Sequence, residues 1–143
     1  MNRISLIALG VKDIAKSFKF YHDGLGFVTD EKMDDLKTIF FNTLGTKFEL
    51  CPLDSLAEDI SKTNPPKIAG GFAGITLVYN VRTEWEVDQT TELARNAGAV
   101  IVKEPEKAAW GGYHAYFQDK DGYYWEIAHN PYWSLDENSM LVF

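Results

Sequence analysis

The sequence contains one cysteine, Cys51, in 143 residues. A single cysteine cannot form a disulfide within the chain, which excludes the disulfide-stabilised class of small secreted domains and indicates a reducing, cytoplasmic location. Long apolar runs are also lacking, and no stretch approaches the ~18 apolar residues of a membrane-spanning helix. The N-terminal run ISLIALGV, residues 4–11, stops at a charged pair and lacks a small-residue cleavage site. We therefore interpret it as a strand and not as a signal peptide.

Positive charge is scarce, since 14 Lys and Arg stand against 21 Asp and Glu, for a net charge of −7. No basic stripe runs through the chain, which argues against nucleic acid and against an anionic membrane surface as partners. The sequence also lacks a phosphate-binding glycine loop, a nucleophile elbow and a CxxC pair.

What the sequence has is a pattern of strands and helices with 14% aromatic residues. Residues 4–11 alternate as a strand, and Asp13 then suits the N-cap of a helix that ends near Gly24 or Gly26. Three further strands are predicted, at about 27–31, 36–42 and 46–51. Residues 53–71 hold a short helical turn and Pro and Gly pairs, and are predicted to be a connector.

The pattern then restarts. Residues 74–81 favour a strand, and Thr83 with Glu86 forms a capping box that opens a helix. A strand over 99–104 and a hairpin over 111–129 complete the second half.

The order strand, helix, strand, strand, strand thus occurs twice and indicates an internal duplication. We align Leu6 with Gly74 and Glu49 with Glu126. One such unit cannot bury both faces of its sheet, so the two are expected to pack together in an α+β domain over 1–143. Its parts are module 1 at about 1–52, the connector, module 2 at about 72–131 and a tail at 132–143.

The closing hairpin sets the direction of its side chains. The turn DKDG, residues 119–122, fits a type I turn followed by a left-handed glycine, which pairs Asp119 with Tyr123. One face then holds only apolar side chains and should pack on the helices. The other face is unusually aromatic for a solvated surface and is interpreted as a ligand-binding face, with plain solvent exposure as the alternative. It carries His114, Tyr116, Gln118, Tyr124 and Glu126.

Two motifs resemble the vicinal-oxygen-chelate superfamily, which includes glyoxalase I, extradiol dioxygenases, fosfomycin-resistance enzymes and bleomycin-binding proteins. They are LGVKDIAKSFKFYHDGLGF near the start and GGYHAYFQDKDGYYWEIAHNP near the end, with Lys120 where proline is usual. The resemblance implies two paired βαβββ modules that form a curved, cup-shaped mixed sheet with helices outside. It also implies a homodimer. Independently of the resemblance, the repeat makes Glu49 the counterpart of Glu126, and both glutamates are expected to face one cleft.

In metal-using members each module offers one ligand from its first strand and one from its last. By the resemblance, the last-strand ligands fall on Glu49 and Glu126, but the first-strand ligands fall on Leu6 and Gly74, which cannot bind a metal. Two carboxylates alone suit Zn, Ni or Fe poorly. No cofactor is therefore predicted. The alternative is a divalent metal held by Glu49, Glu126 and His114.

These observations favour a small-molecule binding protein, or a metal-independent enzyme, that holds an aromatic or cationic ligand in an acidic, aromatic-lined cup. The alternative is a lyase, isomerase or dioxygenase, and a third hypothesis is that the protein acts through its dimer surface. Glu126 and His114 are the catalytic candidates. Trp110 is placed at the rim, either covering a ligand or packing on Tyr132 or Trp133. The ligand-binding candidates are Glu49, Trp110, Tyr116, Gln118 and Tyr124.

Overall fold

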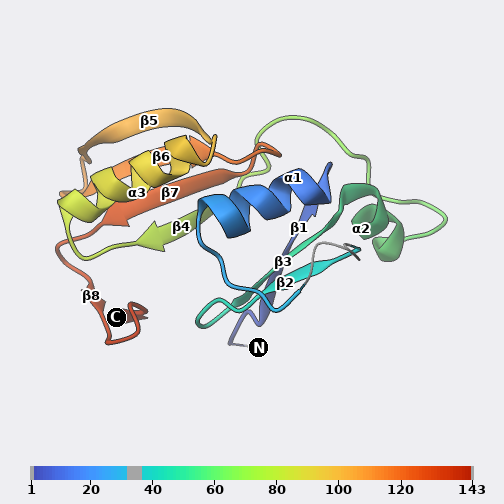
Figure 1. The fold of residues 1–143 in the computed structure, drawn as a ribbon, viewed down its shortest axis with the longest axis horizontal. Coiled ribbons are helices and arrows are strands. Elements are labelled where there is room, and N and C mark those ends of the chain that lie inside the picture. The colour runs from blue at the N-terminus through green and yellow to red at the C-terminus, as the bar shows by residue number, and fades with distance from the viewer. Residues whose placement is uncertain (1, 32–36, 143) are drawn as a thin grey trace. The chain divides into compact units, whose positions relative to one another are not determined.

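The computed structural model describes residues 2–31 and 37–142. The chain divides into two units, Met1–Phe72 and Ala73–Phe143, and each is described by itself. Each unit places helices against its own sheet, so the predicted α+β class is confirmed (Figure 1). Among the described residues no helix combines the length and apolar character needed to cross a membrane.

Unit 1 contains a three-stranded sheet in the order β1-β3-β2 (Figure 1). Strand β1 (Leu6–Val11) runs parallel to β3 (Lys47–Pro52), and β2 (Ile39–Phe41) pairs antiparallel with β3. The connector forms helix α2 (Leu53–Ile60), which packs on β1 and β3.

The strand predicted at 27–31 does not form. Residues 27–31 have no strand assignment, although Asn42 N–H donates to the Val28 carbonyl at 2.7 Å. The Thr29 hydroxyl donates to the Phe40 carbonyl at 2.6 Å and accepts from Glu31 N–H. The Thr29 side chain thus occupies the Phe40 carbonyl, an acceptor that a backbone N–H of a neighbouring strand would otherwise use. In this way a threonine hydroxyl competes with regular strand pairing. The start of the predicted 36–42 strand lies outside the described residues.

The helix predicted after Asp13 is present in two parts. Helix α1 (Ile14–Phe18) begins with the Asp13 side chain accepting from Lys16 N–H at 3.1 Å, and the π-helix η1 (Lys19–Gly24) follows it. Gly26, at φ 78°, ends the turn as predicted. The buried Tyr21 packs on Phe48 of β3, with ring centroids 5.1 Å apart, and so joins helix to sheet.

Unit 2 contains a four-stranded sheet in the order β4-β7-β6-β5 (Figure 1). Strand β4 pairs parallel with β7, and the other two pairs are antiparallel. A short hairpin of β8 and β9 closes the chain. The bounds are β4 (Thr76–Asn80), β5 (Val100–Lys107), β6 (Tyr113–Gln118), β7 (Tyr124–His129), β8 (Ser134–Leu135) and β9 (Leu141–Val142).

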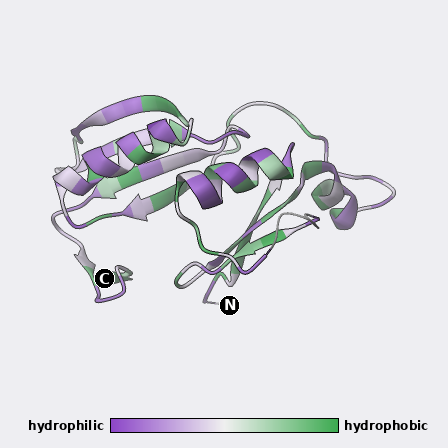
Figure 2. Cartoon of the chain, viewed as in Figure 1, coloured by the Kyte–Doolittle hydropathy of each residue, from purple (hydrophilic) through white to green (hydrophobic). Residues whose placement is uncertain are grey.

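Helix α3 (Glu84–Asn96) packs over β5, β6 and β7. The predicted capping box is confirmed, since Thr83 Oγ1 accepts from Glu86 N–H at 3.2 Å and the Glu86 carboxylate accepts from Thr83 N–H at 3.0 Å. The helix carries both hydrophilic and hydrophobic residues (Figure 2), and it buries Val87, Thr91 and Ala94. It covers the apolar face of the hairpin, where Phe117 and Trp125 stack with ring centroids 6.0 Å apart.

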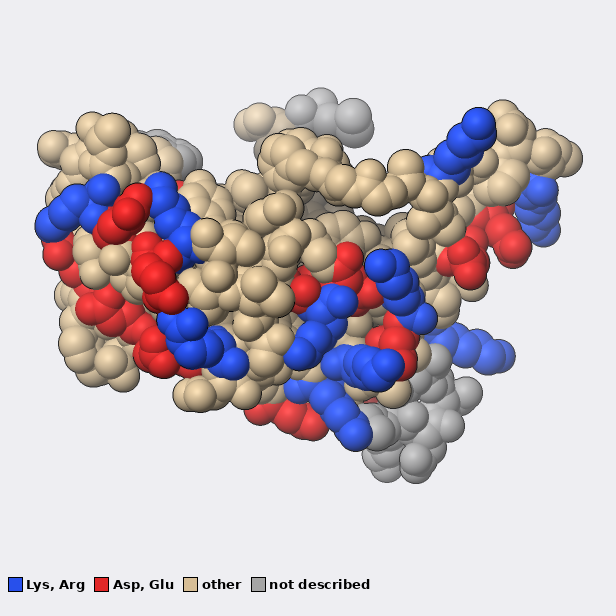
Figure 3. Space-filling view, turned by 90° about the horizontal axis from the view of Figure 1, so that it is seen from above, with Lys and Arg blue, Asp and Glu red and all other residues tan. Residues whose placement is uncertain are grey.

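Basic and acidic side chains lie close together over much of the surface that Figure 3 shows. The ion pairs of the described residues include Arg95 with Glu104 at 2.8 Å and Lys103 with Glu106 at 2.9 Å. On this face the positive charges thus lie among carboxylates and form no broad basic surface.

The predicted register of the closing hairpin is confirmed. Tyr116 lies opposite Glu126, His114 opposite Ala128 and Gln118 opposite Tyr124. The turn has the expected form, because Asp119 N–H donates to the Tyr123 carbonyl at 3.0 Å and Gly122 has φ 94°.

Asp119 is the residue that holds this turn. It is 5% exposed, and its Oδ1 accepts from the backbone N–H groups of residues 121, 122 and 123, each at 2.9 Å. Asp119→Ala leaves these donors without their carboxylate, and we expect it to lower the free energy of unfolding by about 2–3 kcal/mol. Urea unfolding measures this loss. Asp119→Asn keeps one oxygen acceptor, so its free energy of unfolding should fall clearly less than that of Asp119→Ala. Equal decreases for the two variants would show that these hydrogen bonds do not stabilise the turn.

The alignment of the two halves needs one correction. Ala8 pairs with Glu49 and Val78 pairs with Glu126 in matching parallel ladders, so Val78 corresponds to Ala8. The counterpart of Leu6 is therefore Thr76, and the alignment with Gly74 is wrong by two residues. A two-residue shift preserves the alternation of a strand, so the sequence pattern cannot detect it. At the position of the first-strand metal ligand, Thr76 therefore offers a neutral hydroxyl and, like Gly74, no imidazole.

Candidate functional site

The site is built on the sheet face of unit 2 that points away from the apolar residues under α3. The antiparallel register of β6 and β7 puts His114, Tyr116 and Glu126 on this face. The parallel pairing of β4 with β7 adds Val78 and Asn80, which lie beside Glu126 and Ala128. The sequence thus brings polar and apolar groups together around one carboxylate.

His114 links Glu126 to a lysine. Its Nδ1 lies 2.7 Å from Glu126 Oε1, and its Nε2 lies 3.1 Å from the Nζ of Lys103. The His114 and Glu126 side chains are only 8% and 16% exposed. Because an ammonium only donates, Nε2 acts as acceptor and Nδ1–H donates to Glu126. In this arrangement the Nδ1 proton of the imidazole points at the Glu126 carboxylate.

Tyr116 is the second partner of Glu126. Desolvation raises the pKa of its phenol to about 12, with further contributions from its hydrogen bond to Glu126 and from the charge of that carboxylate. The phenol therefore keeps its proton and donates to Glu126. Two donors on the neighbouring strand β6, the imidazole and the phenol, thus orient the carboxylate.

The Tyr116 phenol gives a pH-dependent test. Because its folded pKa lies above the ordinary value near 10, its stabilising effect is complete below pH 10 and is lost as the pH rises towards 12. Ultraviolet titration of the protein and of Tyr116→Phe should differ by one phenol that ionises near pH 12. Glu126→Gln should move this ionisation towards the ordinary value. A difference curve centred near pH 10 would contradict both the burial of the Tyr116 phenol and its contact with Glu126.

Glu126 also lines a pocket of about 520 Å³ in unit 2. Trp110, on the loop between β5 and β6, lies on its wall, and its indole meets His114 edge-on at 5.6 Å between ring centroids. The indole also lies over Gly112, where an added Cβ would be 1.7 Å from the Trp110 ring. The full lining is Val78, Asn80, Trp110, Glu126, Ala128, Asn130, Trp133 and Leu141.

The predicted site residues are not all brought to this pocket. Glu126 and Trp110 line it, and His114 and Tyr116 contact Glu126 from the neighbouring strand β6. Gln118 and Tyr124 share the sheet face but lie at the turn end of the hairpin and do not line the pocket. The Gln118 amide instead donates to the Gly122 carbonyl at 3.4 Å.

Glu49 lies in unit 1, on β3, between Ala8 of β1 and Phe40 of β2. Desolvation raises the pKa of its carboxyl. Cys51 shares this face and is 6% exposed, and burial, together with the charge of Glu49, raises the pKa of its thiol. A raised pKa lowers the thiolate fraction, and this fits a buried cysteine that serves as a small apolar filler. A cleft shared by Glu49 and Glu126 stays a prediction.

Several residues that line the pocket or contact His114 were missed from the sequence. Val78 and Asn80 could have been found from the alternation of β4 with a correct alignment. Lys103 could not have been found from the sequence, because the pairing of β5 with β6 shifts twice. One shift lies between Ile101 and Lys103, and the other lies between Lys103 and Glu106. Simple alternation puts Lys103 on the face of Ile101, and the first shift instead pairs it with Tyr116.

Metal-using members of the resembled superfamily hold a metal ion, but the donors of unit 2 do not fit one. Both nitrogens of His114 already have partners, and one of these is the ammonium of Lys103. A cation at Nε2 would have to displace this like charge. Over residues 2–31 and 37–142, no three His, Cys, Asp or Glu side chains form a group that could hold a metal ion.

Comparison with known proteins identifies the fold and the family. A solved glyoxalase-related enzyme from Fulvimarina pelagi is 27% identical, with a TM-score of 0.86 over 100% of this chain and 99% of its own. A lactoylglutathione lyase from Agrobacterium tumefaciens is 18% identical, with a TM-score of 0.68 over 91% of this chain and 95% of its own, and shows the fold alone.

The uncharacterized protein YraH of Bacillus subtilis is 28% identical over 116 residues, which cover 80% of this chain and 88% of that protein. A sequence model of the Glyoxalase/Bleomycin resistance protein/Dioxygenase superfamily matches residues 3–127. The match spans both units and includes the first motif and most of the second, and the chain therefore belongs to the Glyoxalase/Bleomycin resistance protein/Dioxygenase superfamily.

Proposed function

We propose that the pocket of unit 2 binds a small organic molecule with an aromatic ring and a cationic group, and that it does so without a metal. The observation that carries the proposal is the position of Glu126 in a pocket that two tryptophans, Trp110 and Trp133, also line. A carboxylate attracts a cation, and an indole face binds both cations and flat rings.

The support behind Glu126 suits a binding role. His114 and Tyr116 both donate to the carboxylate and so hold it in one orientation. A preoriented acceptor costs less entropy when a ligand binds, and this favours affinity. Val78 and Ala128 supply apolar contact on the same wall.

A metal-independent enzyme is the second candidate, favoured by the 2.7 Å contact between His114 and Glu126. In such an enzyme Glu126, which faces the pocket, accepts a proton from the substrate as general base. His114 is a positioning residue there, because Lys103 occupies its remaining nitrogen. The glyoxalase-related enzyme from Fulvimarina pelagi, which shares this fold, supports the candidate.

The wider assembly is part of the same proposal. In it the two units pair as modules around one cup, Glu49 faces the ligand together with Glu126, and the chain works as a cytoplasmic homodimer. The exposed apolar side chains of β4, Val78 at 47% and Tyr79 at 53%, support a covered position for this strand in the assembly.

Metal analysis is the experiment that tests this function first. Mass spectrometry on untagged protein should find no stoichiometric metal, and the melting temperature should be equal before and after a chelator. Bound Zn, Ni, Mn or Fe whose removal lowers the melting temperature would overturn the metal-free proposal and favour the Glu49, Glu126 and His114 set.

Calorimetric titration with phenethylamine, which joins a phenyl ring to an ammonium, then tests the pocket. We expect saturable binding, and its absence at millimolar concentration would contradict an aromatic, cationic ligand.

A further inference from the structure

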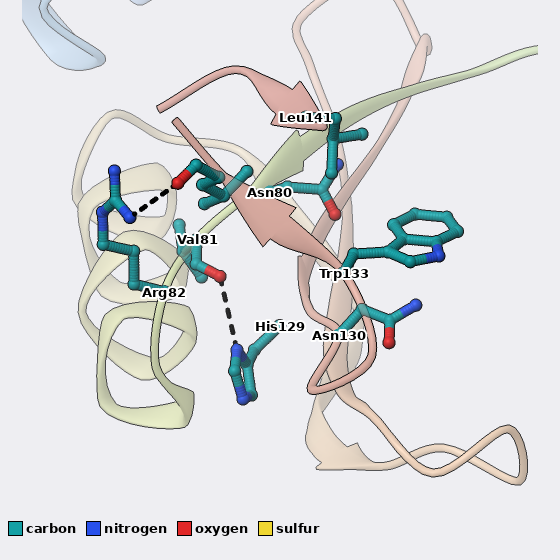
Figure 4. Close-up of a pocket in the computed structure, with 8 residues that line it drawn as sticks. Asn80, Val81, Arg82, His129, Asn130, Trp133 and Leu141 are labelled. Carbon is teal, nitrogen blue, oxygen red and sulfur yellow. Dashed lines mark hydrogen bonds between the residues drawn. The ribbon is translucent and has the colours of Figure 1, made fainter. Parts of the chain in front are cut away.

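A second, narrower pocket of about 150 Å³ adjoins the first in unit 2. Figure 4 shows its lining, which comes from the end of β4, the end of β7 and the C-terminal hairpin. Four residues line both pockets, and the two therefore form neighbouring compartments of one site. The shared residues are Asn80, Asn130, Trp133 and Leu141.

The C-terminal hairpin is fixed to the rest of the unit by Arg82. Its guanidinium donates to the Leu135 carbonyl at 3.2 Å and to the Asp136 carbonyl at 2.5 Å. The backbone of Arg82 is held in turn by the Glu86 carboxylate at 2.6 Å. Trp133 and Leu141 thus line the pocket from a segment that Arg82 holds in place through these two hydrogen bonds.

The shared wall carries two side-chain amides. Within the described residues the Asn80 amide makes no hydrogen bond, and Asn80 lies on the same sheet face as Glu126. Asn130 Oδ1 accepts from Tyr132 N–H at 2.9 Å, which leaves its Nδ2 donors for the pocket that Asn130 lines. Both amides are neutral, and together they offer donors and an acceptor.

We propose that Asn80 and Asn130 recognise a neutral carboxamide-like group of the ligand, next to the ring and the cation that Trp110 and Glu126 hold. This inference rests on the proposed function and adds a specificity contact to it. A neutral group fits better than an anion, because Glu126 repels negative charge and two nitrogens of the Arg82 guanidinium already donate to the carbonyls of the C-terminal hairpin.

The test compares three probes by calorimetric titration: phenethylamine, phenylalaninamide and phenylalanine. The amide adds one carboxamide to the first probe, and phenylalanine replaces that group by a carboxylate. Two added neutral hydrogen bonds should make phenylalaninamide bind about tenfold more tightly than phenethylamine. Phenylalanine should bind more weakly than the amide.

Variants assign this preference to the two asparagines. Asn80→Ala should bring the ratio of the amide and phenethylamine affinities close to one, and Asn130→Asp, which keeps the acceptor for Tyr132, should lower the ratio. Asn96→Ala, at the exposed end of α3, should keep the wild-type ratio. Melting curves check that each variant is folded, and the ratio within one variant removes any general change in affinity.

The outcomes separate the two proposals. If phenethylamine binds but the amide binds no more tightly, or if phenylalanine binds best, the carboxamide inference is overturned and the proposed function stands. If the preference exists but survives both asparagine variants, the assignment to these residues is overturned. If none of the three probes binds, the proposed function fails and the inference fails with it.

Discussion

Replacing Glu126 with glutamine should weaken phenethylamine binding by about tenfold or more while the fold persists. A hydrogen bond from an ammonium to a carboxylate contributes about 1.5–3 kcal/mol, and 1.4 kcal/mol corresponds to a factor of ten in affinity. Glutamine keeps the size of the side chain and an oxygen that can accept from His114 Nδ1–H. The substitution therefore removes the charge that faces the pocket and little else. Calorimetric titration measures the loss.

The control for net charge is Glu58→Gln, which removes one carboxylate from the exposed surface of α2. Its affinity for phenethylamine should equal that of the unmodified protein. Raising the salt concentration separates the two effects further, because long-range attraction is screened while a direct contact in the pocket is screened less. If Glu126→Gln and Glu58→Gln weaken binding equally, Glu126 does not contact the cation.

The predictions that succeeded from the sequence rest on local chemistry. The turn DKDG requires Gly122 in the left-handed region, and this requirement fixed the register that sets Tyr116 opposite Glu126. The capping box of Thr83 and Glu86 likewise fixed the start of α3. In both cases a few neighbouring residues determine the backbone, and no distant contact is needed.

The predictions that failed depend on contacts between distant segments. The strand at 27–31 was lost because the Thr29 hydroxyl takes the Phe40 carbonyl, and Lys103 reached the site through shifts in the pairing of β5 with β6. The wall formed by Trp133 and Leu141 depends on Arg82, which lies about fifty residues earlier in the sequence. Such contacts leave no periodic signal in one sequence, so the site was predicted around Glu126 and not beyond it.

The second large effect is expected at Gly112, which has no room for a side chain. A Cβ at this position would lie 1.7 Å from the Trp110 ring and 2.6 Å from the His129 carbonyl oxygen. Gly112→Ala must therefore move the indole off its position, and overpacking of this kind typically costs about 1–3 kcal/mol of stability. Trp110 also forms a wall of the pocket, so phenethylamine affinity should fall about tenfold as the ring contact is lost.

Two comparisons show whether Trp110 causes these losses. Gly70→Ala adds the same methyl group where nothing lies within 4 Å, and it should change neither the melting temperature nor binding. In a Trp110→Ala background the indole is absent, so Gly112→Ala should cost less stability than it does alone, with only the His129 carbonyl left to crowd it. Equal costs in both backgrounds would place the strain in the backbone. The missing side chain at Gly112 would then not be needed to make room for the Trp110 indole, and something other than Gly112 would hold the indole in the pocket wall.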